Sequence, residues 1–158
     1  MIKNIYRKIV SEKQRIALHY ALYKIEAVLL GGNRYECCCC GKSSRRFLSH
    51  GNLGLRKNIK CPHCLSLERT RILCMYIKNE IFKSGIQPMR VLHFAPVKGL
   101  KDFLKNSPYV STYIDADLNP NVATYQADMT RMPYEDNSFD LLICSHILYC
   151  IPEDRKAM

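Results

Sequence analysis

The sequence lacks the features that would mark a membrane-spanning or secreted protein. No stretch approaches the roughly 18 uncharged apolar residues that a membrane span requires. Residues 1–10 carry early charge and no continuous apolar core, so a secretory signal is not predicted. Tryptophan, internal repeats and low-complexity tracts are absent as well. What remains is a chain of 158 residues, 47% of them apolar, which is enough for one ordinary domain or a small module plus part of a larger one.

Acidic residues are scarce in the first part of the chain only. Residues 1–90 contain 18 Lys and Arg but five Asp and Glu, whereas residues 91–158 contain six and nine. This asymmetry predicts two units with different roles. A basic unit attracts RNA or another acidic partner, or anionic lipid, and the alternative is an ordinary solvated surface. The strongest candidates for polyanion contacts are Arg45, Arg46, Arg56 and Lys57.

Nine cysteines are present, but they do not form a disulfide pattern. Four of them are consecutive, Cys37 to Cys40, where neighbouring side chains cannot all find separate partners, and the total is odd. Metal binding is the better interpretation, and it predicts a reducing, cytoplasmic setting.

Two short cysteine pairs have the spacing of a zinc site. Cys37-x-x-Cys40 and Cys61-Pro-His-Cys64 are separated by 20 residues, as in sites where two turns each present two thiolates. Glycine after the first pair and proline inside the second favour these turns, so the cysteines at 38 and 39 become spacers. Because protein fills all four positions, the predicted zinc is structural.

The N-terminal residues 1–30 are predicted to form an amphipathic helix that ends at a Gly-Gly-Asn sequence through a left-handed glycine cap. We expect its apolar stripe to pack against another part of the protein. A membrane surface is the alternative, because basic residues accompany the stripe. The stripe consists of Ile2, Ile5, Tyr6, Ile9, Leu18, Leu22, Ile25 and Leu29, and the basic residues are Lys3, Arg7, Lys8, Lys13 and Arg15.

A second helix is predicted from Ser66, its N-cap, to about Lys83, and residues 84–88 form a short linker. Beyond the linker, short apolar runs alternate with loops and a helical segment, which is typical of a parallel, doubly wound sheet. The runs are 90–95, 109–114, 123–127 and 139–145, the helix is 99–105, and another helix begins at Pro152.

The predicted fold class is therefore α/β. It comprises an N-terminal helix and a zinc ribbon followed by a partial Rossmann-like doubly wound parallel sheet. The predicted segments are an N-terminal helix (1–34), a zinc-ribbon-like module (35–65), a connecting helix and linker (66–89) and a partial Rossmann-like domain (90–158).

Polar or small residues follow each predicted strand, where doubly wound sheets bind their ligands. A turn of small residues, 95–99, follows the first strand, and Asp115 and Asp117 follow the second. Asp128 follows the third strand, and His146 follows the fourth. A carboxylate in such a position can accept hydrogen bonds from two ribose hydroxyls, so the order of these residues predicts a nucleoside-sized pocket.

The run from Ala127 to Leu148 contains Asp128-x₄-Pro133-x₅-Phe139-Asp140. This run resembles the middle of class I S-adenosylmethionine-dependent methyltransferases, where the pattern links the third and fourth strands. The resemblance extends to a bacterial subgroup with an N-terminal zinc-ribbon-like module. It is carried there by the upstream cysteines and by the sequence Ser-Leu-Glu-Arg-x-Arg, which starts at 66 and leads to Leu-His-Phe-Ala-Pro at 92–96. The resemblance covers residues 30–158.

This resemblance implies a cofactor site and its residues. By that likeness Ala95 and Gly99 border the methionine part of S-adenosylmethionine. Asp117, in preference to Asp115, holds the ribose. Asp128 and Met129 meet the adenine.

Three departures from the family pattern qualify this expectation. The first loop has one glycine, the fourth strand is followed by Leu-Tyr-Cys in place of Leu-Glu-His, and about four strands are present where the family sheet has seven. Either the chain is a fragment, or a second polypeptide completes the sheet, or the pocket is vestigial. We therefore expect weak cofactor binding and little turnover.

The leading functional hypothesis is an S-adenosylmethionine-dependent methyltransferase, or the cofactor-binding portion of one. His146 is a weak candidate for the base, and the sequence identifies neither the methyl acceptor nor the oligomeric state. The alternative is a non-catalytic zinc-ribbon module that binds RNA or another acidic partner and carries a degenerate Rossmann-like domain.

Overall fold

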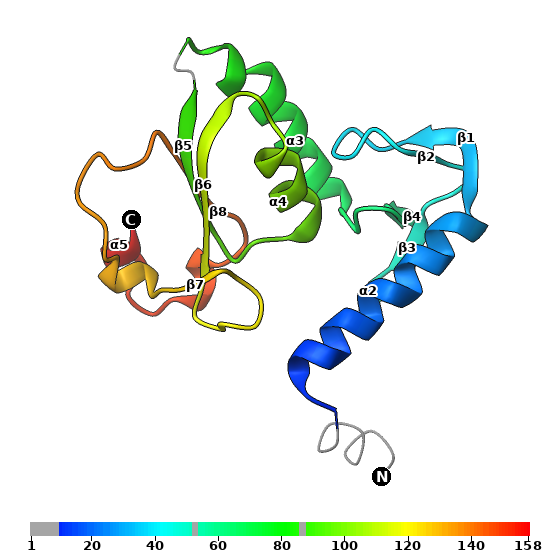
Figure 1. Cartoon of the computed structure of the whole chain (residues 1–158), viewed down its shortest axis with the longest axis horizontal. Coiled ribbons are helices and arrows are strands. Elements are labelled where there is room, and N and C mark those ends of the chain that lie inside the picture. The colour runs from blue at the N-terminus through cyan, green and yellow to red at the C-terminus, as the bar shows by residue number, and fades with distance from the viewer. Residues whose placement is uncertain (1–9, 52–53, 86–87) are drawn as a thin grey trace.

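The computed structural model describes residues 10–51, 54–85 and 88–158. Figure 1 shows a long helix and small hairpins on one side and a parallel sheet with covering helices on the other. The predicted α/β class is confirmed, with an N-terminal helix, a four-cysteine cluster on antiparallel hairpins and a four-stranded parallel sheet. Among the described residues, no helix is long and apolar enough to cross a membrane.

The N-terminal helix α2 spans Glu12–Leu29 and begins with a capping box in which Ser11 and Gln14 exchange hydrogen bonds. Its packed face carries Ile16, Tyr20, Tyr23 and Ala27. The predicted stripe lies on the opposite side of the helix, because its residues are rotated by about half a turn from those of the packed face. Its described members, Leu18, Leu22, Ile25 and Leu29, are 49 to 65% exposed, so the prediction that this stripe packs within the protein is wrong for them. Its remaining members, Ile2, Ile5, Tyr6 and Ile9, lie outside the described residues.

The helix ends without the predicted left-handed glycine. Its C-cap is Leu30, and the following residues form strand β1 (Gly31–Glu36), which pairs antiparallel with β2 (Ser43–Ser44). Gly32 is required there for a different reason, since a Cβ at this position would lie 2.9 Å from the backbone nitrogen of Arg45. The Arg45 guanidinium donates to the carbonyl of Leu29 at 2.7 Å and therefore caps the helix end.

The second hairpin consists of β3 (Leu48–His50) and β4 (Arg56–Lys60), which also pair antiparallel. Each hairpin lies next to one cysteine pair: the first pair follows β1, and the second pair follows β4. The hairpins are too short to bury much apolar surface, so their stability depends on what the cysteines bind.

Helix α3 (Glu68–Asn79) follows the second cysteine pair and leads to the 3₁₀ helix η1 (Ile81–Lys83). The predicted N-cap is wrong, because the helix is capped by Leu67 without a side-chain hydrogen bond. The hydroxyl of Ser66 instead contacts two sulfurs, Cys37 Sγ at 3.4 Å and Cys64 Sγ at 3.1 Å. A nearby sulfur cluster is therefore the reason that this serine does not cap the helix.

The parallel sheet has the strand order β7-β6-β5-β8, in which the first strand in sequence is central. Helix α4 connects β5 to β6. In chain order, the third and fourth strands are shorter than predicted, and the second is longer. The observed bounds are β5 (Met89–Phe94), α4 (Lys98–Lys105), β6 (Val110–Asp117), β7 (Tyr125–Gln126) and β8 (Leu141–Cys144).

Side chains of β5 alternate between the two sides of the sheet. Met89 and Val91 join a buried cluster with α3, α4 and the cysteine-bearing turns. Leu92 and Phe94 point to the other side, toward the 3₁₀ helices η2 (Met129–Arg131) and η3 (Leu148–Cys150) and helix α5 (Asp154–Ala157). The first of these two clusters thus joins the cysteine-bearing turns to the sheet.

Candidate metal centre and cofactor site

The two cysteine pairs form turns with the same backbone hydrogen bonds. In the first, Gly41 N donates to Cys37 O, and Cys37 N donates to Lys42 O. In the second, Leu65 N donates to Cys61 O, and Cys61 N donates to Ser66 O. The residue after each pair has a positive φ, 66° at Gly41 and 63° at Leu65. A left-handed residue at this point curls the chain around its sulfurs, as expected from the glycine in the first turn.

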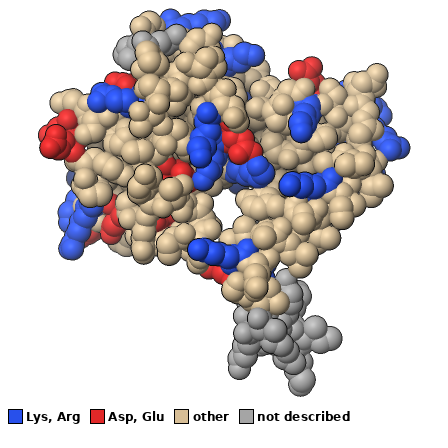
Figure 2. Space-filling view, viewed as in Figure 1, with Lys and Arg blue, Asp and Glu red and all other residues tan. Residues whose placement is uncertain are grey.

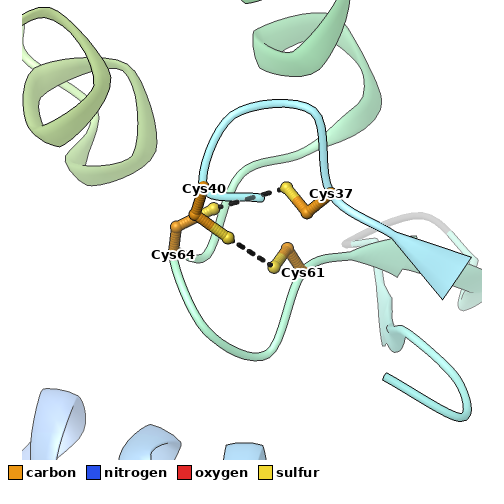
Figure 3. A group of neighbouring side chains, drawn as sticks. All are labelled: Cys37, Cys40, Cys61 and Cys64. Carbon is orange, nitrogen blue, oxygen red and sulfur yellow. Dashed lines mark hydrogen bonds between the residues drawn. The ribbon is translucent and has the colours of Figure 1, made fainter. Parts of the chain in front are cut away.

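The four sulfurs lie within 4.8 Å of one another (Figure 3). Cys37 Sγ is 3.7 Å from Cys64 Sγ, and Cys40 Sγ is 3.9 Å from Cys61 Sγ. Tetrahedral zinc with zinc–sulfur bonds of about 2.3 Å separates its sulfurs by about 3.8 Å. The donor set and its spacing therefore fit zinc.

The intervening cysteines lie outside this cluster. Cys38 is exposed, and its thiol donates to the carbonyl of Arg71 at 3.5 Å. Cys39 is buried, and its thiol donates to the carbonyl of Thr70 at 3.8 Å. The described structure thus places them as the spacers that the sequence predicts.

The sulfurs affect one another's ionisation. The neighbouring thiols, of which Cys39 has the largest effect, hold the pKa of Cys37 well below its usual range. The proximity of Cys37, in turn, raises the pKa of the Cys40 thiol. Four thiolates at this separation need a bound cation to coexist, because their mutual repulsion in a buried site is otherwise uncompensated.

A second site lies at the carboxyl ends of the sheet strands. A cavity of about 460 Å³, here named the strand-end cavity, is bounded by residues that follow β5, β6 and β7 and by the segment 147–153. Four of the five predicted cofactor residues line it: Ala95, Asp117, Asp128 and Met129. Its volume is in the range of small-molecule sites.

Ala95 follows β5 in a strained conformation. Its φ is +48°, in the left-handed region that favours glycine, and its backbone N–H donates to the carbonyl of Ala116. An alanine thus adopts a glycine-like backbone conformation at this position.

The two aspartates of β6 have different surroundings. Asp115 is buried and paired with Lys101, and its Oδ1 accepts a hydrogen bond from Thr124 Oγ1 at 2.8 Å. Burial alone raises the pKa of Asp115, but the hydrogen bonds from Lys101 and Thr124 outweigh it and hold that pKa below its usual value. Asp117 lies at the cavity, and one of its oxygens accepts from Asn119 N at 2.8 Å. Asp117, not Asp115, is therefore available to a ligand.

Asp128 is exposed at the rim of the strand-end cavity and caps η2. Its Oδ1 accepts from the backbone N–H and the hydroxyl of Thr130, and the backbone bond lowers the pKa of its carboxyl. The next residue, Met129, is buried and contributes an apolar wall.

Gly99 does not lie with the other four. It sits in the first turn of α4 against the second cysteine turn, where a Cβ would be 2.9 Å from Ser66 Cβ, 3.2 Å from Cys64 O and 3.4 Å from Cys64 Sγ. The expectation that Gly99 converges on the cofactor pocket is corrected by this contact. The glycine allows α4 to approach the metal centre closely.

His146 follows β8 with a φ of +61° and is exposed. It is not among the residues that line the strand-end cavity. No sequence signal pointed to the far wall of that cavity, which is formed by Ile147, Cys150, Ile151, Pro152 and Glu153. The sequence Leu-Tyr-Cys at 148–150 is unusual for the resembled family, but no apolar periodicity indicated that this segment folds back over the strand ends.

A cavity at the carboxyl ends of a parallel sheet lies where doubly wound α/β proteins bind their ligands. Residues 101–158 match the model of a methyltransferase domain family. Neither the curated proteins nor the solved structures contain a match. The matched residues include Asp117, Asp128 and Met129, whereas β5 and the metal centre precede them.

Proposed function

We propose that this chain binds S-adenosylmethionine in the strand-end cavity and acts as a methyltransferase, or as the cofactor-binding portion of one. The observation that carries the proposal is the convergence of Ala95, Asp117, Asp128 and Met129. They come from three strand ends, and three of them fall within the region that matches the methyltransferase family.

The residues have distinct roles in this proposal. The Asp117 carboxylate accepts hydrogen bonds from the two ribose hydroxyls. Asp128 and Met129 border the adenine, the first with polar atoms and the second with apolar surface. Ala95 borders the methionine part, where its left-handed backbone keeps the loop clear of the ligand.

The cofactor supplies a methyl group already activated by its sulfonium, and the protein mainly aligns the reactants and excludes water. A nucleophile on the acceptor forms a bond to the methyl carbon while the carbon–sulfur bond breaks, and the sulfur keeps the electron pair. The nucleophile loses its proton to a base. The exposure of His146, outside the cavity lining, gives no support to this residue as that base.

Calorimetric titration with S-adenosylhomocysteine tests the ribose assignment. Asp117→Asn preserves the acceptor for Asn119 N but removes the charge and one acceptor oxygen, so we expect affinity to fall about tenfold to over a hundredfold. Asp136→Asn is the matched control, because Asp136 is exposed in a loop away from the cavity. Equal affinity in the wild type and Asp117→Asn contradicts the assignment.

For the four-cysteine cluster we propose a structural zinc ion held by Cys37, Cys40, Cys61 and Cys64. The sulfur spacing supports this ion, and the burial of Cys37, Cys61 and Cys64 supports a structural role. A reducing, cytoplasmic setting is part of the same proposal, since the thiolates must remain reduced.

RNA or another acidic partner is a second candidate ligand, through the basic N-terminal half. Of the four predicted cations, Arg45 caps α2 and Arg56 is paired with Glu68. Arg46 and Lys57 instead line one shallow depression together, which favours these two as contacts. If RNA binding is absent at low salt, or unchanged in Arg46→Gln/Lys57→Gln, this candidate function is wrong.

A further inference from the structure

Helix α2 carries a wide apolar face that stays exposed in the described structure. Successive helix residues differ by about 100°, so eight residues fall within an arc of about 140° on the side away from the packed face. All eight are exposed, and none is charged. They define the outer face of α2: Gln14, Ala17, Leu18, Ala21, Leu22, Ile25, Val28 and Leu29. In Figure 2 the surface over α2 is largely free of charged side chains.

The large side chains of the outer face expose much of their apolar surface. Val28 is 80% exposed and Leu29 is 65% exposed, and Leu22 and Ile25 are 55 and 59% exposed. Scattered exposed apolar residues are ordinary, but a contiguous apolar patch marks contact with another molecule or a membrane. The outer face is therefore a candidate interaction surface.

Contacts along α2 hold the outer face outward. At the start of the helix, the carboxylate of Glu12 accepts from Asn119 Nδ2 at 3.2 Å and Asn121 Nδ2 at 2.9 Å. Farther along, the Tyr23 hydroxyl accepts from Lys60 Nζ at 2.8 Å. Because both contacts are made by the packed side of the helix, the outer face is presented to a partner without rearrangement of the fold.

Cations lie along both margins of the outer face. Lys24 lies about 20° beyond the face on one side, with Lys13 next to it, and Arg15 lies about 20° beyond it on the other. Glu26, next to Arg15, is the acidic residue at these margins. Among the described residues, none of the three cations takes part in a salt bridge. The margins thus carry a positive charge that is available to a partner.

The unit around the outer face is basic as well. At the C-terminal end of the helix, Leu29 lines a depression together with Arg45 and Arg46. Residues 1–90 contain 18 Lys and Arg but five Asp and Glu. A second copy of the chain would bring these like charges together, whereas an anionic surface complements them. The charge therefore favours an anionic occupant over self-association.

An anionic lipid surface matches both properties of this helix. Apolar helix faces bordered by Lys and Arg are typical of helices that lie in the plane of a lipid surface. Leucine and isoleucine side chains enter the acyl boundary there, while long cationic side chains reach the headgroups. The outer face is a convex row of side chains along about 27 Å of helix, and a lipid surface receives such a row without a complementary pocket.

We propose that the outer face of α2 binds anionic lipid surfaces, with its large apolar side chains at the acyl boundary and Lys13, Arg15 and Lys24 at the headgroups. The chain is thus held at a membrane surface without crossing it. This role is separate from cofactor binding, because it rests on α2 and not on the strand-end cavity.

Cosedimentation of the zinc-loaded chain with lipid vesicles tests the proposal. Vesicles of equimolar phosphatidylglycerol and phosphatidylcholine supply the anionic surface, and vesicles of phosphatidylcholine alone are the neutral comparison. We expect binding to the anionic vesicles, weaker binding to the neutral ones, and loss of the difference as salt concentration rises.

Leu22→Gln/Ile25→Gln tests the apolar contribution. Glutamine has a helix propensity close to that of leucine, so the helix is retained, and removal of two apolar side chains should weaken binding to anionic vesicles at least about tenfold. Ile72→Gln/Met75→Gln is the matched control, since these residues of α3 are 67 and 50% exposed. The control should stay within about twofold of the wild type.

Lys13→Gln/Lys24→Gln tests the charge contribution. Each cation near an anionic surface contributes about 1 kcal/mol, so we expect about fivefold weaker binding for each charge removed. Lys78→Gln/Lys83→Gln removes the same charge from exposed positions at the end of α3 and in η1. Weakening that is confined to the α2 variant supports the margin cations as the headgroup contacts.

Several results overturn the proposal. Absence of binding to anionic vesicles does so, as does equal binding to neutral vesicles or equal weakening by the α3 controls. Light scattering that shows a dimer lost in Leu22→Gln/Ile25→Gln, without vesicle binding, assigns the face to self-association instead. RNA binding that depends on Lys13 and Lys24 but not on Leu22 and Ile25, without vesicle binding, assigns the cations to RNA. Titration with S-adenosylhomocysteine is independent of all these outcomes and tests the proposed function alone.

Discussion

Gly99→Ala tests whether the metal centre and α4 depend on each other. The added methyl group would lie 2.9 Å from Ser66 Cβ and 3.2 Å from the carbonyl oxygen of Cys64, so one of the two elements must move. Overpacking of this kind costs about 1–3 kcal/mol. Alanine recovers about 0.5–1 kcal/mol in a helix interior, and less in a first turn. We expect a net loss of about 1 kcal/mol in the free energy of unfolding.

Urea denaturation of the zinc-loaded protein measures this loss, and competition with a chromophoric chelator measures zinc retention. Gly54→Ala is the control, because nothing lies within 4 Å of a Cβ at Gly54. Ser66→Gly removes the atom that the new methyl group meets, so Gly99→Ala should cost less in that background. Unchanged stability and zinc retention in Gly99→Ala would refute the reasoning.

Two further predictions concern the metal and the buried histidine. Cys61→Ser should release zinc and loosen residues 35–64, whereas the control Cys38→Ser in the same module should retain one zinc per chain. Metal analysis of the two purified variants measures this difference. Full zinc content in Cys61→Ser would contradict the assignment. Burial lowers the pKa of His93 to about 4, so the unfolded chain takes up this proton first as the pH falls. Stability present above pH 6.5 should therefore be lost between pH 6.5 and 4, by roughly 3 kcal/mol for this group. Denaturation of wild type and His93→Phe across this window checks the prediction, and equal slopes contradict it.

Local spacing was sufficient to predict that Cys37, Cys40, Cys61 and Cys64 come together. Four sulfurs in two short turns leave few arrangements, and the glycine at 41 distinguishes the ligands from the spacers. Ser66 shows the limit of local reasoning, because its sequence context suits a helix cap while its hydroxyl faces sulfurs from the other turn.

The strand-end residues could be predicted because parallel strands point their carboxyl ends to one edge of the sheet. Gly99 could not be placed in this way. A glycine just after a strand is compatible both with close approach to a ligand and with close packing of a helix, and only the tertiary contact with Cys64 distinguishes them. The orientation of α2 was equally inaccessible, because both of its sides carry apolar residues.

Hydrogen–deuterium exchange with and without S-adenosylhomocysteine tests the central claim most directly, since it reports both binding and its location. The account predicts slower exchange in the segments that line the strand-end cavity, at 94–95, 117–118, 127–130 and 147–153. The metal-binding turns at 37–42 and 61–66 should be unchanged. Identical exchange at saturating ligand concentrations, or protection confined to the metal-binding turns, would contradict the assignment of this cavity as the cofactor site.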